Sequence, residues 1–516
     1  GETPQYGGTA RFSNKAELPN DDPTLTGSIT SRNVLSPLHG NGGLVGTKRE
    51  ANGEPRPVLA ESWTMSEDAK IWTFKLRSGV LWHDGTPLVA EDVKFSLNLG
   101  LTPPKGRRAT SIGNSLPGLQ DIQVVDEHTV RLVFNQFSAH LLEALASTGN
   151  EIALPRHLGQ KELDKGNVTF GLAPLGWVSL GPYKYDQYVR GGSFTVVRFD
   201  KYWEKDAQGR SMPYLDSVVN TPIPDRAVAL GAFRAGRLDA MSRGAGTSLD
   251  PQEVQILKKS LPGKVWYHRF PYLDRTIDMN AQKPPFSDIR ARKAVFLYMD
   301  REEGAQKMLG GHAHSSGWLS PSSWWASNAY KEWPGYTQAT KKQDQAEAKR
   351  LMQEAGLVGA SAPITCRTDY LYMCEFQLSV LTELGFKSEI MLLDVNAEGE
   401  AGRTMNFITK SGGICDGLLP NCLASLVSTA VNARYNDPKL DAWDRTISTS
   451  TDPLARREAL WAAERYFLLE QAHAAPFLRE EVVAPYRTYL KGSIVPGYQA
   501  GDNSDRATDW IDKKMQ

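Results

Sequence analysis

Apolar and polar side chains alternate along several short stretches in the first half of the chain, and this period of two predicts strands. Trp72–Leu76 alternates in this way before a turn at residues 77–79. Val80–Trp82 predicts a second short strand, which ends at the turn dipeptide Asp84–Gly85. Two further alternating stretches meet at residues 126–128, so this part of the chain is expected to consist of strands joined by tight turns.

A helical pattern follows the first of these strand pairs. Val89, Val93 and Leu97 lie among acidic residues, and the negative charges of Glu91 and Asp92 favour the start of a helix. His83 and Asp84, which resemble part of a catalytic site, are therefore expected to be turn residues of a scaffold. Further helices are predicted at residues 139–147, 225–236, 288–309, 342–357 and 451–472.

Strand and helix patterns alternate over two unequal halves, which predicts an α/β protein. At 516 residues the chain is too long for one ordinary core and indicates several lobes of roughly 100–200 residues each. Two extended stretches, residues 263–280 and 472–487, look like strands that run from one lobe to another. Two such crossings would form a hinge that is stiff laterally and able to bend.

Composition and charge argue against two classes of protein. Lys and Arg together number 59, as do Asp and Glu, so the formal net charge is zero and nucleic acid is not an expected partner. No run of about 18 apolar residues occurs, so no segment is expected to span a bilayer. The opening GETPQYGGTARFS lacks a basic and an apolar signal region, as expected if a targeting segment has been removed or is absent.

Four cysteines lie within one stretch of the second half: Cys366, Cys374, Cys415 and Cys422. Their even number permits disulfides or a metal site. Neither pair has the spacing of a structural zinc site, and no histidine lies among them. Local bridges and buried thiols both remain open, and a Cys415–Cys422 bridge that closes a loop is favoured. Such a bridge would suit an oxidising compartment.

Five segments together resemble one protein family. Residues 57–97, PVLAESWTMSEDAKIWTFKLRSGVLWHDGTPLVAEDVKFSL, resemble the signature of the periplasmic peptide-binding proteins. These are the dipeptide, oligopeptide and nickel class, family 5, of the solute-binding proteins of ABC transporters. Four later segments are similar to that family in the same order along the chain: LGPYKYDQYVRGGSFTVVRFDKYW, DRTIDMNAQKPPFSDIRARKAVFLYMDRE, DQAEAKRLMQEAGL and AHAAPFL.

The resemblance implies a fold of two α/β lobes joined by two crossovers, with an extra domain inserted in the first lobe. The first lobe would comprise residues 1–44, 178–264 and 482–516, the insert residues 45–177, and the second lobe residues 265–481. It also implies a function. A monomeric receptor, periplasmic or extracellular, would close on one solute and deliver it to an ABC-transporter permease. No reaction and no cofactor are implied.

Two charged ligand contacts follow from the same resemblance. In peptide-binding members an acid in a second-lobe loop pairs with the ligand's amino group, and an arginine meets its carboxylate. The loop SGGICDGLLPNC places Asp416 near that acid, although the tryptophan and the Gly-Asp and Asp-Pro pattern usual there are missing. Arg367 fits the arginine approximately, and a guanidinium can hold a carboxylate through two hydrogen bonds. A turn residue beside Gly417 and a solvent-facing salt bridge are the structural alternatives.

Aromatic and polar loop residues supply the other candidate contacts. Trp318, Trp324 and Trp325 either form a wall for a planar or sugar-like ligand or pack in a core. Tyr370 and Tyr372 lie close to Arg367 and have the same two options. The first-lobe candidates are Asp22, Asn33 and Arg243.

An enzyme is disfavoured, because the sequence contains neither Gly-x-Ser-x-Gly nor the phosphate-loop motif. His312 and His314 alternate in one segment, but two ligands are too few for a nickel site. The predicted solute is a di- or oligopeptide or an amino-acid conjugate. Oligosaccharides and opines are the main alternatives, followed by nickel chelates and a chaperone-like interaction.

Overall fold

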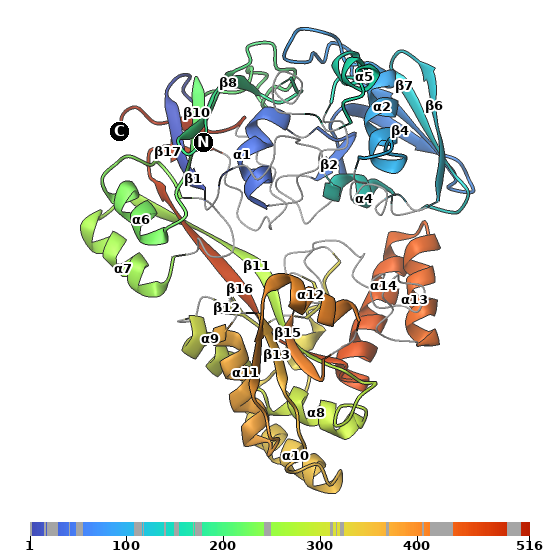
Figure 1. Cartoon of the computed structure of the whole chain (residues 1–516), viewed down its shortest axis with the longest axis vertical. Helices are drawn as coiled ribbons and strands as arrows, with labels where there is room; N and C mark the ends of the chain where they lie inside the picture. Colours follow the sequence, from blue (N-terminus) through green and yellow to red (C-terminus); the bar gives the residue numbers. More distant parts are fainter. Residues whose placement is uncertain are drawn as a thin grey trace. The chain divides into compact units, whose positions relative to one another are not determined.

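The computed structural model of the chain divides into two compact units (Figure 1), Gly1–Phe270 with Val482–Gln516, and Pro271–Glu481. The structure describes residues 3–14, 17, 29–40, 42–47, 55–107, 116, 118–138, 141–148, 154–168, 170, 178–241, 249–309, 313–315, 317–319, 325–367, 371–404, 407–412, 437–492 and 507–515.

The first unit contains a four-stranded sheet in the order β1-β10-β9-β8. β1 and β10 are parallel, and the other two pairings are antiparallel. Helix α1 packs against this sheet, and Phe12, Leu38 and Tyr183 are buried in the shared core. The elements are β1 (Thr9–Asn14), α1 (Ile29–His39), β8 (Tyr183–Val189), β9 (Ser193–Arg198) and β10 (Ser217–Pro222).

A separate antiparallel sheet in the first unit has the order β4-β5-β7-β6. In β5 the side chains of Trp72, Phe74 and Leu76 are buried and alternate with more exposed ones, which confirms the predicted period of two. Helix α2 packs on β6 and β7. The elements are β4 (Ala60–Met65), β5 (Ile71–Leu76), α2 (Ala90–Leu101), β6 (Leu119–Asp126) and β7 (Thr129–Phe134).

His83 joins two parts of this unit through both of its ring nitrogens. The backbone N–H of Ser179 donates to Nδ1 at 3.1 Å, and Nε2 donates to the carbonyl of Gly181 at 3.0 Å. The ring also packs edge-on against Phe199. These contacts are those of a scaffold residue in a turn.

Smaller elements complete the first unit. α6 and α7 share a small apolar core built around Phe233 and Leu257. The elements are β2 (Val45–Thr47), β3 (Pro55–Pro57), α4 (Leu141–Thr148), α5 (Arg156–Asp164), α6 (Arg226–Arg234), α7 (Pro251–Ser260), β17 (Leu490–Lys491) and β18 (Trp510–Ile511).

The second unit is built on a sheet with the order β12-β16-β11-β15-β13-β14. Its strands are β11 (Val265–Met279), β12 (Ala313–His314), β13 (Ile364–Arg367), β14 (Ile390–Leu393), β15 (Thr409–Gly412) and β16 (Ala474–Arg487). Its helices are α8 (Ile289–Tyr298), α9 (Arg301–Leu309), α10 (Lys341–Glu354), α11 (Leu371–Glu383), α12 (Val395–Arg403), α13 (Pro438–Thr449) and α14 (Pro453–Glu464), with the short η2 (Ala329–Glu332) and η3 (Gln338–Thr340) and the π-helical η6 (Arg465–Glu470).

Two expectations about this part of the chain have different outcomes. The extended stretches near 263–280 and 472–487 are the long strands β11 and β16, and each boundary between the units falls inside one of them. The helix predicted over 288–309 is instead two helices. The backbone is extended at Met299, and the Asp300 carboxylate then accepts the backbone N–H of Glu303 at 3.0 Å and starts α9. The division of the first half into a lobe and an inserted domain stays a prediction.

Candidate solute-binding site

Three parallel strands of the second unit define a topological switch point. The chain runs from β13 through α11 to its neighbour β14, and then through α12 to β15 on the other side of β13. The direction of winding therefore reverses at β13. In sheets of this kind, ligands bind beyond the carboxyl ends of the strands at the point of reversal. The candidate site is consequently the carboxyl ends of β13 and β15.

The described backbone pairing of β13 with β15 lies at the start of both strands. Among the described residues, β13 and β15 pair only at Ile364 with Thr409 and at Thr365 with Lys410. Beyond that point β13 stays paired with β14 as far as Arg367, whereas β15 stays paired with β11 through Gly412. We call the carboxyl ends of these two strands, Arg367 and Gly412, the fork.

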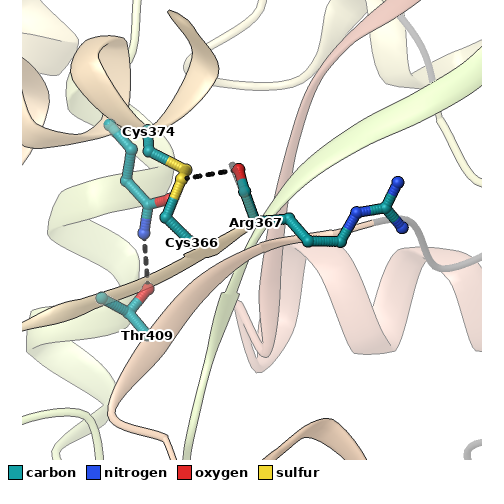
Figure 2. Close-up of a disulfide and its surroundings, with 5 residues drawn as sticks. Cys366, Arg367, Cys374 and Thr409 are labelled. Carbon is teal, nitrogen blue, oxygen red and sulfur yellow. Dashed lines mark hydrogen bonds between the residues drawn. A yellow bond between two sulfur atoms is a disulfide. The ribbon is translucent and has the colours of Figure 1, made fainter. Parts of the chain in front are cut away.

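Arg367 is the last residue of β13 and is half-buried at the fork. Side chains alternate between the two faces of a strand, so Cys366 and Arg367 point to opposite sides. Figure 2 shows the Arg367 side chain extending away from the Cys366 sulfur. The arginine to which the family resemblance points therefore lies at a strand end, and its contact with a solute stays a prediction.

A disulfide joins Cys366 to Cys374 at the start of α11 (Figure 2). Their Cα atoms are 6.2 Å apart, and both side chains are fully buried. Closing so short a loop restricts the unfolded chain by about 2.5 kcal/mol in the loop-entropy model. The sequence left local bridges open and favoured the Cys415–Cys422 pair, which lies outside the described residues.

Buried hydrogen bonds attach the same helix to β15. Gln377 Nε2 donates to Thr409 Oγ1 at 2.8 Å, and that hydroxyl donates to the carbonyl of Asp278 in β11 at 2.7 Å. Sequence reasoning missed Gln377, because a glutamine in a helix gives no signal of its partner on a distant strand. α11 is therefore bonded to both strands of the fork.

Lys410 is the other cation near the fork. Its Nζ lies 3.1 Å from Glu398 and 3.7 Å from Asp278, and the side chain is buried. A buried ammonium held by two carboxylates is not available to a solute without breaking these pairs. Arg367 remains the candidate for a solute's carboxylate because of its position at the carboxyl end of β13.

Two of the predicted tryptophans are core residues. Trp318 is 1% exposed, its ring packs against Phe467, and its backbone N–H donates to Glu464. Trp325 is 6% exposed, and its carbonyl accepts the indole N–H of Trp461 at 2.9 Å. Their positions are those of the packing alternative, and a contact between either ring and a solute stays an untested prediction.

The remaining candidates are distributed as follows. Tyr372 is half-buried in the first turn of α11 and packs against the core of the second unit. Asn33 lies in α1. Outside the described residues lie Asp22, Arg243, Trp324, Tyr370 and Asp416, together with Cys415, Cys422 and His312.

Glu464, which accepts the Trp318 N–H, is fully buried, and burial raises the pKa of its carboxyl to about 7. The unfolded carboxyl ionises near 4.5, so rising pH favours the unfolded state between about 4.5 and 7. This penalty amounts to roughly 3 kcal/mol at the upper end. Glu464→Gln removes it, so the variant's melting temperature should rise relative to the unaltered protein as pH increases through that window.

The measurement is thermal unfolding of both proteins from pH 4 to 8, with Glu470→Gln as the matched control. Glu470 is exposed on the adjoining π-helix, so its variant should follow the unaltered protein at every pH. Buried histidines contribute equally to all three proteins and cancel in the differences. A Glu464→Gln difference that does not change with pH would show that this carboxyl is already ionised in the fold.

Within the described part of the chain, no three His, Cys, Asp or Glu side chains gather as a metal site requires. Of the helices in those same ranges, none has the length and apolar character needed to cross a membrane.

Comparison with known proteins identifies the family. The model of the bacterial extracellular solute-binding proteins, family 5 Middle, matches residues 54–402. The chain belongs to this family. Its members are substrate-binding receptors of ABC transporters, as the sequence resemblance implied.

Individual relatives are similar over most of the chain. The periplasmic oligopeptide-binding protein OppA of Escherichia coli K12 is 28% identical over 377 residues, which cover 69% of this chain and 64% of OppA, just under two thirds of its length. The glutathione-binding protein GsiB of the same strain is 24% identical over 471 residues, or 87% and 85% of the two chains.

A solved structure shares the fold of the whole chain. It is that of AgaA of A. tumefaciens R10 in complex with agropinic acid, with a TM-score of 0.73 and 23% identity over 98% of this chain and 99% of AgaA. The mixed α/β fold is thus that of the periplasmic binding proteins of family 5.

Proposed function

We propose that this chain is the receptor of an ABC importer for a di- or oligopeptide, or an amino-acid conjugate, that carries a free carboxylate. The observation that carries the proposal is the position of Arg367 at the fork, where a switch point is expected to bind ligands. A guanidinium offers two parallel donors that match the two oxygens of a carboxylate.

The named solutes of the relatives support this choice. OppA binds oligopeptides, GsiB binds glutathione, and AgaA is bound to agropinic acid. Each of these solutes has a carboxyl group. Neutral oligosaccharides have none and would not use the paired donors of a guanidinium.

Two observations support a location outside the cytoplasm: the family and the disulfide. The relatives OppA and GsiB are binding proteins, the former periplasmic by name, and a buried disulfide persists in oxidising compartments. We place the receptor outside the cytoplasm, with a membrane permease as its partner. We further propose β11 and β16, which continue from one unit into the other, as the hinge of solute-driven closure.

An opine is the second candidate solute, because the AgaA complex matches nearly the whole chain. Opines are amino-acid conjugates and share the carboxylate with peptides. The two classes differ in shape and in their other polar groups, so only direct binding separates them.

The test is a thermal-shift screen of the purified chain. Its compounds are di- to pentapeptides, glutathione, agropinic acid and a neutral oligosaccharide as the control. A solute at about 100 times its dissociation constant stabilises the folded state by roughly 2.7 kcal/mol. A carboxylate-bearing compound is expected to raise the melting temperature and the oligosaccharide to leave it unchanged. The opposite pattern would refute the assignment of Arg367.

A further inference from the structure

We infer that helix α11 is a brace for the solute site. Its disulfide to Cys366 and its hydrogen bond from Gln377 hold the two strands that end at the fork. Cys366, Cys374 and Gln377 are on this view positioning residues, which act on the solute through Arg367. The inference rests on the proposed contact between Arg367 and a carboxylate.

The first anchor lies next to Arg367 in the chain. Cys366 directly precedes it on β13, and Cys374 is in the first turn of α11. The side chains of both cysteines are fully buried, so the disulfide is shielded from solvent. The covalent link restricts both the end of β13 and the first turn of α11.

The second anchor lies one helical turn further on. Residues three apart share a helix face, so Cys374 and Gln377 face the sheet together. Gln377 is 1% exposed, and its partner Thr409 is not exposed at all. Thr409 in turn donates to the backbone of β11, and so the second anchor fixes β15 to its other neighbour as well.

The brace acts on the part of the strand ladder that leads to the fork. The ladder between β13 and β15 ends at Thr365 and Lys410 in the described part of these strands, two residues before Arg367. Recognition of a carboxylate by two hydrogen bonds requires placement to within about 0.5 Å. The side chains of α11 supply this restraint on the face of the sheet to which Cys366 points, while Arg367 points to the opposite face.

The experiment compares three proteins: the unaltered chain, the Cys366→Ala/Cys374→Ala double variant, and Gln377→Met, which keeps the disulfide and a similar side-chain volume. Hydrogen exchange of residues 366–377 is measured without solute. Affinities for tri-alanine and for tri-alanine amide are measured by calorimetry.

In both variants, the backbone amide hydrogens of residues 366–377 are expected to exchange faster than in the unaltered chain. Their affinity for tri-alanine should fall about tenfold and that for the amide less than twofold, because only the free acid uses the guanidinium fully. A purely structural loss would weaken both ligands alike. The ratio of the affinity for tri-alanine to that for its amide therefore measures how well Arg367 is positioned. If the double variant does not fold, Gln377→Met alone tests the brace.

Ile447→Ala is the matched control. Ile447 is buried in α13, so this variant lowers stability without touching α11 and should keep the acid-to-amide ratio. Unchanged exchange and an unchanged ratio in both test variants would overturn the brace. If Arg367→Ala keeps the ratio, the carboxylate contact itself is wrong. If tri-alanine does not bind, the proposal for short peptides fails and the exchange data alone decide whether α11 restrains the fork.

Discussion

Arg367→Ala is expected to weaken the binding of a carboxylate-bearing solute by about 30-fold or more, equivalent to at least 2 kcal/mol. The reason is the loss of two charge-assisted hydrogen bonds, which leaves the solute's carboxylate without its counter-charge at the end of β13. Folding should be little affected, since Arg367 is half-buried at a strand end. Isothermal calorimetry with the best compound of the screen measures the change.

Two arginine controls sharpen this result. Arg367→Lys keeps the positive charge and loses the planar pair of donors, so its affinity should lie between those of the unaltered chain and Arg367→Ala. Arg350→Ala removes an exposed arginine on α10 that pairs with Glu347 and should bind as the unaltered protein does. Binding by Arg367→Ala within twofold of the unaltered chain would exclude Arg367 as the contact.

Asp92→Ala is expected to lower the free energy of unfolding of the first unit by about 3–5 kcal/mol. The buried Asp92 carboxylate accepts the backbone N–H of Val89 at 3.0 Å and of Arg156 at 2.9 Å, and the indole N–H of Trp82 at 3.3 Å. A buried donor such as the Trp82 indole, left without a partner, costs about 1–3 kcal/mol; the two partly buried backbone donors add to this, and the costs do not add fully. The melting temperature should fall by roughly 6–10 °C.

Glu91→Ala is the matched control, because Glu91 precedes Asp92 in the same first turn of α2 but is exposed. Its loss removes only a favourable charge near the helix N-terminus, worth about 0.3–1 kcal/mol. Thermal unfolding of both variants makes the comparison. Equal, small shifts would mean that the three hydrogen bonds to Asp92 contribute little to the stability of the fold.

Asp92 illustrates what the sequence predicts and what it omits. The charge pattern places Glu91 and Asp92 together at a helix start, and the structure confirms this. The pattern does not distinguish the exposed acid from the buried one, because Arg156 lies 64 residues away along the chain. Long-range partners of this kind follow from the packing of α2 and α5 and have no local signal.

The candidate site shows the same limit. Arg367 is a candidate because of the family resemblance, and its contact with a solute stays a prediction. The fork depends on the order of β13, β14 and β15, which no local pattern specifies. The Cys366–Cys374 bridge spans a strand-to-helix connection, and spacing alone left it among several pairings. Trp318 and Trp325 are aromatic residues in a polar loop segment by sequence, and only packing against residues such as Phe467 reveals that they belong to a core.

The central claim is that this receptor recognises its solute through a carboxylate. Calorimetric titration of the unaltered chain with a short peptide and with its C-terminal amide tests it most directly. The free acid is expected to bind at least tenfold more tightly than the amide, a difference of about 1.4 kcal/mol. Equal affinities for the two, or tighter binding of the amide, would contradict the claim.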